Sequence, residues 1–443
     1  MKKIIDILIA IVIVLILAGG VYWYMFLRVP TTAPNNIPNQ QQPTTGFVPL
    51  NRTVSTTTKT ANTGQGNATT TITNIIPIVP LPVLRILSST PVGGYGASTT
   101  ASTTVVRWID RGRGNIYEAR GDSLDIMTIS NTLLPRVYNS WWNKNDTSFI
   151  GQYLGDKGDK VTTVITNILK RVIALTPTAI KSSTTTPPVA QASPIQQITE
   201  TDYELKGKII SGNIIAVASS PKRDRILVIN NENNHAVGYV SNFDGSKQTQ
   251  LFDLPFTQLT ADWPEENTIA ITTKASASYS GYLYFINVKN GAISEILGNI
   301  PGLTTRVSRD ATKVIYSDSA TDKIETTVYD IKSQKSIDII FRTLADKCVW
   351  SSKFKEQVYC GVSSQIPNGS YPDDWYLGKA SFIDSIWLLN GNTGEVRQIA
   401  NLLNQGNALI DTSNPQLDNN DDFLFFMNKN DLSLWSLDLV SSN

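Results

Sequence analysis

The sequence predicts an all-β protein, a seven-bladed β-propeller with six blades as the alternative count. From Leu84 onward, short runs rich in Val, Ile, Tyr and Trp alternate with clusters of Gly, Asn, Asp and Ser. Their spacing of about 8–12 residues is typical of sandwiches, barrels and propellers. The runs also group into repeats of about 40–55 residues with four strands each, which is the pattern of propeller blades.

Residues 1–28 predict a transmembrane signal-anchor. No charged residue lies between positions 7 and 27, and a helix of that length spans about 31 Å, close to a bilayer core of roughly 30 Å. Lys2 and Lys3 precede this run, so the positive-inside tendency predicts a cytoplasmic N-terminus and an extracytoplasmic C-terminal domain. We therefore expect a single-pass cell-membrane protein. Signal cleavage at the small residues Ala18, Gly19 and Gly20 is the alternative.

Residues 29–83 predict a disordered tether, because Pro, Thr, Asn and Gln dominate and too little apolar surface is available to offset the entropy of ordering. The propeller domain is expected over residues 84–443. Within it, the tract 176–199 is again rich in Pro and Thr. We expect this tract to form a surface loop or a spacer across the ring, between the second and third blades.

The blades can be assigned from the repeats. Five units follow one another from Ile214 to Leu439, and two more lie between Val105 and Leu169. The strand at 84–88 is predicted to complete the last blade, which would close the ring and remove its open edges.

The clearest copy of the unit is the predicted hairpin at 347–361. Cys348 and Cys360 lie symmetrically about Phe354, so a hairpin centred there places them opposite each other. In an extracytoplasmic compartment we expect a disulfide, which by closing a loop of about 13 residues would contribute on the order of 3 kcal/mol. The alternative is two buried thiols that pack as small apolar groups.

Two segments resemble the S-P-D-G turn of TolB-like (WD40-like) β-propellers, at residues 218–225 and 307–313. Asp244-Gly245, Asn290-Gly291 and Thr393-Gly394 resemble the later turn of that repeat, where a positive φ is required. The D-G pair is incomplete in both segments, and the WD dipeptide is missing. Anchor, tether and propeller together resemble uncharacterised bacterial envelope proteins. The resemblance implies an architecture and no particular activity.

The overall charge argues against a nucleic-acid partner. Lys and Arg number 38 against 37 Asp and Glu, so the chain has no strong positive field. His235 is the single histidine, which removes most Ser-His-Asp, Cys-His and multi-histidine zinc schemes. We expect no cofactor, no metal and no assignable catalytic residue.

The candidate binding site is the long insertion at 363–385. Its aromatic and acidic side chains suit sugar stacking and hydroxyl recognition, and paired carboxylates could hydrolyse glycosides. Alternatively, its aromatics pack on the blade edge and its aspartates cap turns. The candidate residues are Tyr371, Asp373, Asp374, Trp375, Tyr376 and Asp384.

Two functions follow from this organisation. The first is a membrane-tethered propeller, anchored through residues 7–27, that binds a protein or a cell-envelope polymer as a scaffold, with the binding in its loops. The alternative is a propeller glycoside hydrolase or lyase that acts on envelope glycans through the aspartates of the 363–385 loop.

Overall fold

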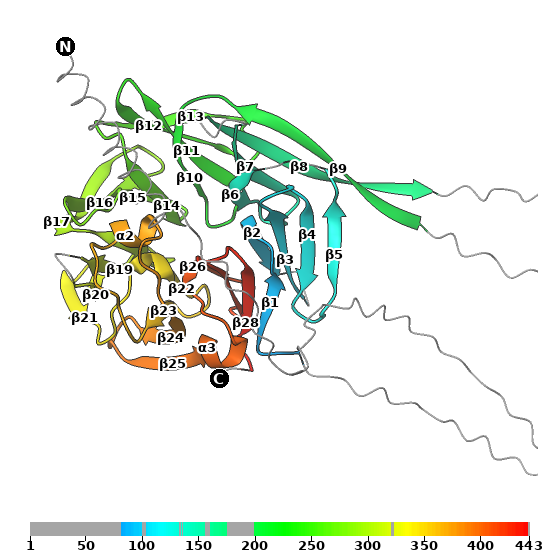
Figure 1. The fold of residues 1–443 in the computed structure, drawn as a ribbon. Helices are drawn as coiled ribbons and strands as arrows, with labels where there is room; N and C mark the ends of the chain where they lie inside the picture. Colours follow the sequence, from blue (N-terminus) through cyan, green and yellow to red (C-terminus); the bar gives the residue numbers. More distant parts are fainter. Residues whose placement is uncertain are drawn as a thin grey trace, which may run out of the picture. The chain divides into compact units, whose positions relative to one another are not determined.

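The computed structural model describes residues 81–99, 103–132, 134, 136–155, 160–174, 199–319 and 323–441. These residues form seven four-stranded antiparallel sheets, arranged as the blades of a propeller (Figure 1). The prediction of seven blades is confirmed. The predicted membrane segment at 7–27 lies outside the described residues, as does the tether up to residue 80. Within the described ranges, no helix is long and apolar enough to cross a membrane.

Each blade runs from an innermost strand outward. The first contains β2 (Val92–Thr99), β3 (Thr104–Asp110), β4 (Ile116–Arg120) and β5 (Ile126–Ser130); the second contains β6 (Val137–Trp142), β7 (Ser148–Leu154), β8 (Val161–Ala174) and β9 (Thr199–Ile210). The third contains β10 (Ile214–Ser219), β11 (Arg225–Glu232), β12 (His235–Asn242) and β13 (Thr249–Leu254). The fourth contains β14 (Leu259–Glu265), β15 (Thr268–Thr273), β16 (Ser280–Asn287) and β17 (Ile293–Pro301).

The remaining blades follow the same order. The fifth contains β18 (Thr304–Val307), β19 (Lys313–Asp318), β20 (Glu325–Asp330) and β21 (Lys335–Asp338). The sixth contains β22 (Cys348–Trp350), β23 (Gln357–Ser363), β24 (Asp384–Asn390) and β25 (Val396–Asn401). The seventh contains β26 (Thr412–Leu417), β27 (Phe423–Asn428), β28 (Leu434–Asp438) and β1 (Leu84–Ser88). Short helical turns lie between strands: η2 (Ala345–Lys347), α2 (Asp373–Tyr376) and α3 (Leu402–Gly406).

The seventh blade closes the ring as predicted. Its outermost strand, β1, comes from the start of the domain and pairs antiparallel with β28 from its end, with Leu84 opposite Leu437. The last blade therefore joins two distant parts of the chain, and this pairing closes the ring.

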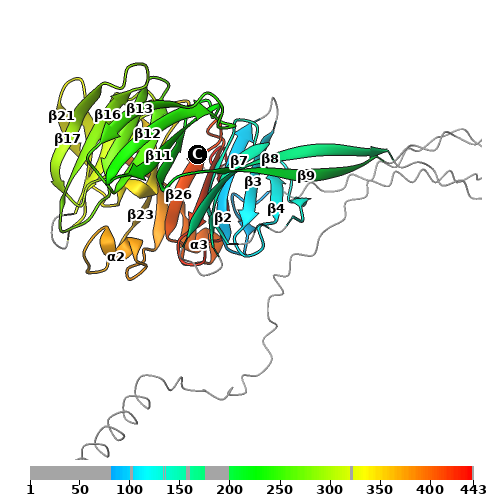
Figure 2. The ribbon, with the colours of Figure 1, turned by 90° about the horizontal axis from the view of Figure 1, so that it is seen from above.

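The second blade differs from the prediction. Its strands β8 and β9 pair from Thr163 opposite Ile210 to Ala174 opposite Thr199 and extend as a long hairpin beyond the other strands (Figure 2). The Pro/Thr-rich tract is thus an insertion between β8 and β9, and Thr199 belongs to β9. It does not lie between the second and third blades. The strand before the tract, β8, is rich in Thr, Ile and Val, which favour extended pairing, whereas β9 contains Thr and Ile among charged residues.

The first blade also contains an inner strand that the sequence did not assign. In β2, glycines interrupt the apolar alternation because the neighbouring blade approaches closely. A Cβ on Gly93 would lie 2.5 Å from the carbonyl oxygen of Val137 in β6. Gly94 has a φ of 139°, a conformation that other residues rarely adopt.

The core lies between the blades, where the faces of adjacent sheets pack together. Leu227 and Ile229 of the third blade pack with Trp263 and Ile271 of the fourth, and all four are buried. In the sixth blade, Cys348 lies opposite Cys360 in the β22–β23 register, and the two form a disulfide inside such an interface.

Candidate binding site

Four turns between the two innermost strands of a blade share one hydrogen-bond pattern. In the third blade, Ser220 Oγ accepts from the backbone N–H of Asp224 at 3.3 Å and of Arg225 at 3.1 Å. The side chains that accept in the same way in the second, fifth and seventh blades are Asn143, Ser308 and Asp418. The resemblance to the S-P-D-G turn therefore has a physical basis, because the first side chain of each turn caps two backbone donors.

The fourth residue of each turn lies in the left-handed region, where the S-P-D-G turn has glycine. The residues and φ values are Asp146 (52°), Arg223 (54°), Ala311 (54°) and Asp421 (56°). A non-glycine residue there costs of the order of 1–2 kcal/mol, and such strain gathers at functional sites. Two of these strained side chains, Asp146 and Arg223, meet each other across neighbouring blades.

Asp146 and Arg223 form a partly satisfied ion pair. Arg223 Nη1 lies 3.3 Å from Asp146 Oδ1, and Nη2 donates to the backbone oxygen of Lys144 at 3.3 Å. Asp146 is fully buried, and its Oδ2 has no partner within the described residues. Burial raises the pKa of Asp146 to about 6, although Arg223 opposes the shift. Burial also lowers the pKa of Arg223, and Arg309 acts in the same direction.

A cavity of about 510 Å³ opens between the innermost strands at this end of the blades. Arg223 and Arg309 both line it, and Arg309 is exposed and makes no ion pair with any described residue. Aromatic and polar groups complete the wall, among them Tyr95, Trp141, Trp142, Asp262 and Asn419. We call this the arginine-lined cavity. Two guanidinium groups beside aromatic faces can hold a carboxylate or phosphate group and stack against its carrier.

A smaller cavity of about 200 Å³ shares part of this wall. Asp262 and Arg309 line both cavities, and Arg306 lines the smaller one. Arg306 lies 3.7 Å from the carboxylate of Asp346. The smaller cavity is thus lined by two arginines, one of them paired, and by one aspartate.

The aromatic side chains of the predicted loop make contacts inside the fold, both with one another and with residues outside the loop. Tyr371 and Trp375 are 1% and 4% exposed and belong to an apolar cluster with Phe382. The Tyr371 hydroxyl donates to the backbone oxygen of Pro367 at 2.6 Å. Tyr376 is 39% exposed, and its hydroxyl donates to Asp346 Oδ2 at 2.5 Å. Burial, followed by the charge of Asp346, raises the pKa of Tyr376.

Two aspartates of the loop bind backbone groups. Asp373 Oδ2 accepts from the N–H of Ala277, which follows β15 of the fourth blade, at 2.6 Å. Asp374 Oδ2 accepts from the N–H of Ser370 at 2.9 Å and so caps the turn before α2. Both carboxylates therefore fasten the loop.

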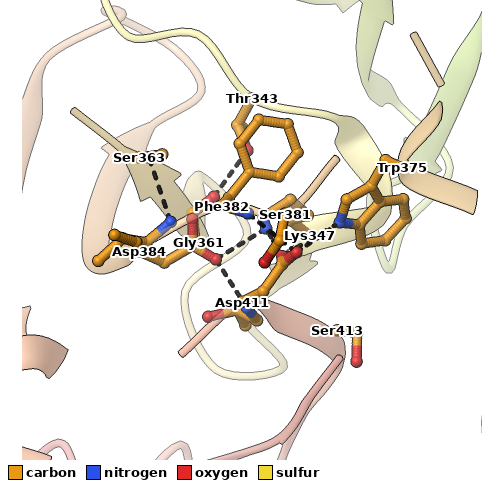
Figure 3. A network of polar contacts seen from close by, with 12 residues as sticks. Thr343, Lys347, Gly361, Ser363, Trp375, Ser381, Phe382, Asp384, Asp411 and Ser413 are labelled. Carbon is orange, nitrogen blue, oxygen red and sulfur yellow. Dashed lines mark hydrogen bonds and ion pairs between the residues drawn. The ribbon is translucent and has the colours of Figure 1, made fainter. Parts of the chain in front are cut away.

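The sixth candidate, Asp384, belongs to a buried cluster that the sequence analysis did not identify. Its Oδ2 lies 2.8 Å from Lys347 Nζ, which also contacts Asp411 Oδ1 (Figure 3). Lys347 and Asp384 are each 1% exposed and Asp411 is fully buried. Burial raises the pKa of Asp384. We call Lys347, Asp384 and Asp411 the buried lysine cluster.

A sequence signal existed for part of this cluster. Lys347 directly precedes the apolar run Cys348-Val349-Trp350, and Asp411 follows Ile410 at the start of a strand. A charged residue directly beside an apolar strand needs a partner if its side chain is buried. The sequence could not identify that partner, because Lys347 and Asp411 are 64 positions apart. Across the described residues, no group of three His, Cys, Asp or Glu side chains could hold a metal ion.

The two regions lie at opposite ends of the antiparallel blades. The arginine-lined cavity opens at the turns that follow the innermost strands, such as the β10–β11 turn. The buried lysine cluster lies where innermost strands begin, before β22 and β26, and at the start of β24.

Comparisons with known proteins give likenesses in fold. No family model and no curated protein sequence matches the chain. TolB from Acinetobacter baumannii is 11% identical over 64% of this chain and 58% of its own, with a TM-score of 0.39. A putative TolB from Agrobacterium tumefaciens is 14% identical over 50% and 73%, with a TM-score of 0.35. Oligogalacturonate lyase from Vibrio parahaemolyticus is 8% identical over 79% and 97%, with a TM-score of 0.43. The chain thus spans less than two thirds of the length of the Acinetobacter protein.

Proposed function

We propose that this propeller is a binding scaffold that holds an anionic segment of a protein or envelope polymer in the arginine-lined cavity. The observation that carries the proposal is the pair Arg223 and Arg309 on one cavity wall, with Arg309 unpaired among the described residues. Guanidinium groups form strong charge-assisted hydrogen bonds with carboxylates and phosphates. An anionic ligand would also relieve the repulsion between the two arginines.

The strained backbone of the third-blade turn supports the same proposal. Arg223 occupies the position where glycine would be unstrained, and this conformation directs its side chain toward Asp146 and the cavity. Strain of this kind persists when the surrounding structure fixes the residue, which is common at ligand sites.

The expected location also fits a scaffold. The uncharged run at 7–27 would tether the propeller to the membrane, and the disulfide between Cys348 and Cys360 suits an extracytoplasmic compartment, where disulfides persist. We propose that the domain faces outward on such a tether.

The alternative, hydrolysis or lysis of envelope glycans by the 363–385 loop, requires aspartates that can reach a substrate. Asp373 and Asp374 accept hydrogen bonds from backbone donors, and Asp384 is buried against Lys347. Their engagement in the fold favours binding over catalysis as the role of this protein.

Binding can be tested with the full chain in detergent, using the fluorescence of Trp141 and Trp142 in the cavity wall. The ligands are two anionic oligomers, oligogalacturonate and an oligoglutamate peptide, with neutral oligoglucose and oligoglutamine as matched controls. We expect saturable binding of an anionic oligomer that weakens with salt, because exposed charges are screened.

Two results would contradict the proposal. One is the absence of binding by both anionic oligomers. The other is an Arg309→Gln variant that binds the anionic oligomers with the same affinity as wild type. Shortening of oligogalacturonate that depends on Asp373 would instead establish the enzymatic alternative.

A further inference from the structure

The buried lysine cluster places an amine and two carboxyl groups in a site closed to water. Lys347 Nζ lies 4.5 Å from the centre of the Phe382 ring and 5.3 Å from the Trp375 ring. All of these side chains are less than 5% exposed. Charges are costly in such surroundings, so a reaction that removes an ammonium and a carboxylate together is favoured there.

We propose that Lys347 and Asp411 join covalently, through an amide bond between Nζ and Cγ, with Asp384 transferring the proton. The inference is independent of the proposed binding function, since it concerns the other end of the blades. It assigns Lys347 as nucleophile and Asp411 as acyl partner.

The hydrogen bonds of Asp411 suit the role of an acyl group. Its Oδ2 accepts from Trp375 Nε1 and from the N–H of Phe382, both at 3.0 Å, and the same indole N–H also donates to Oδ1 at 3.1 Å. Two donors at this distance match the arrangement that stabilises the oxyanion of a tetrahedral intermediate. Its Oδ1 contacts Lys347 Nζ, so the oxygen that would leave is the one next to the attacking nitrogen.

Asp384 is placed to transfer the proton. Its Oδ2 lies 2.8 Å from Lys347 Nζ and accepts from the N–H of Thr412 at 2.7 Å, while its Oδ1 has no partner among the described residues. Thr412 begins β26 of the seventh blade. The blades approach so closely here that a Cβ on Gly361 would lie 2.6 Å from Thr412 and 3.0 Å from Asp384 Oδ2. This packing fixes the carboxyl group beside the amine.

The reaction balances without an oxidant or a cofactor. The Lys347 ammonium gives one proton to Asp411, and the neutral nitrogen attacks Cγ, forming the C–N bond while negative charge develops on Oδ2. Asp384 takes a proton from the nitrogen, and one proton is returned to Oδ1, which leaves as water. The net change converts one ammonium and one carboxylate into one amide and one water, and Asp384 ends unchanged. Fixed proximity of nucleophile and acyl group can supply much of the barrier reduction.

The bond would connect the sixth and seventh blades directly. Lys347 precedes β22 and Asp411 precedes β26, and the disulfide begins at the next residue, Cys348. The sixth blade would then carry two adjacent covalent links, the amide at Lys347 and the disulfide at Cys348, next to the seventh blade, which closes the ring.

The test is the intact mass of the full chain after reduction and denaturation. We expect a mass below that of the sequence by one water, together with a proteolytic fragment that joins the peptides of Lys347 and Asp411. Lys313 and Asp330 serve as an internal control, because they form a more exposed pair at 2.7 Å and should remain unlinked. The sequence mass, with an unmodified Lys347 peptide, would overturn the proposal.

Variants assign the roles. Asp411→Asn should lose one ammonia in place of water, since the acyl group then carries an amide. Lys347→Arg should keep the full mass. Asp384→Asn should slow the loss of water by about a hundredfold, as expected for the loss of a proton-transfer group. Loss of ammonia from Asp384→Asn would show that position 384 is the acyl partner, which would overturn the assignment to Asp411.

Discussion

The arginine-lined cavity and the buried lysine cluster both contain acids and bases, yet they differ in access and in pairing. At the cavity, Arg309 is exposed and forms no ion pair with a described residue, and Asp146 Oδ2 has no hydrogen-bond partner among these residues. In the cluster, Lys347 contacts two carboxylates and no member is more than 1% exposed. Open and incompletely paired charge can take a ligand. Closed and paired charge serves the fold or reacts within it.

The largest expected effect comes from removing the amine at the centre of the cluster. Lys347→Met would remove the group that pairs with Asp384 and that we propose is joined to Asp411, and it should lower the free energy of unfolding by about 3–5 kcal/mol. Urea denaturation measures this. In the matched control, Lys379→Met removes a lysine whose side chain is 66% exposed, 3.6 Å from Asp374, and should cost less than about 1 kcal/mol. Equal effects of the two changes would remove the distinction between the regions.

The disulfide should contribute the next largest effect at the same end. Its cysteines are 12 positions apart. The double change Cys348→Ala and Cys360→Ala should lower the unfolding free energy by about 3 kcal/mol under oxidising conditions, because the cross-link restricts the unfolded chain. Repeating the urea titration with a reductant is the control, since wild type and variant should then converge. A difference that persists after reduction would assign the loss to side-chain packing.

The pH dependence of stability should separate Asp146 from exposed aspartates. Burial raises the folded-state pKa of Asp146 from 3.8 to about 6, so the folded state binds this proton more tightly than the unfolded state. Its contribution to stability is present at low pH and is lost as pH rises through about 6. Relative to wild type, Asp146→Asn should therefore gain up to about 3 kcal/mol between about pH 4 and pH 7.

A control with the opposite sign is available. Hydrogen bonds from the side chain and backbone of Ser246 lower the pKa of Asp244. Wild type should gain stability from this group as pH rises through the acid range. The free energy of unfolding of Asp244→Asn should therefore fall relative to wild type over that range. Urea titrations at several pH values would report both slopes, and a constant difference for Asp146→Asn would argue against a raised pKa.

The smallest effect on stability should accompany a clear effect on binding. Arg309→Gln should lower the affinity for the anionic oligomer by about tenfold, as expected for the loss of a charge-assisted hydrogen bond. Its unfolding free energy should stay within about 0.5 kcal/mol of wild type, because the side chain is exposed. Fluorescence titration and urea denaturation measure the two quantities. Arg120→Gln, at an exposed arginine paired with Asp122 and outside the cavity wall, is the control and should leave the affinity unchanged.

Much of the architecture followed from the sequence because strand pairing is largely local. Alternating apolar residues and turn clusters located the strands of the third to seventh blades, including the facing positions of Cys348 and Cys360. The inner strand β2 was missed because its glycines interrupt the apolar alternation. They are required by the close approach of the neighbouring blade. The β8–β9 hairpin was missed because its two strands are separated by a long tract.

The sequence by itself determined the number and order of the blades, the closing strand and the cysteine pairing, since each depends on periodicity or on neighbours in the chain. Only the tertiary structure decided which charges meet. Asp146 and Arg223 are 77 positions apart, and Lys347 and Asp411 are 64 apart. Contacts of this kind arise where rigid blades pack around the ring, and the spacing of residues in the sequence does not predict that packing.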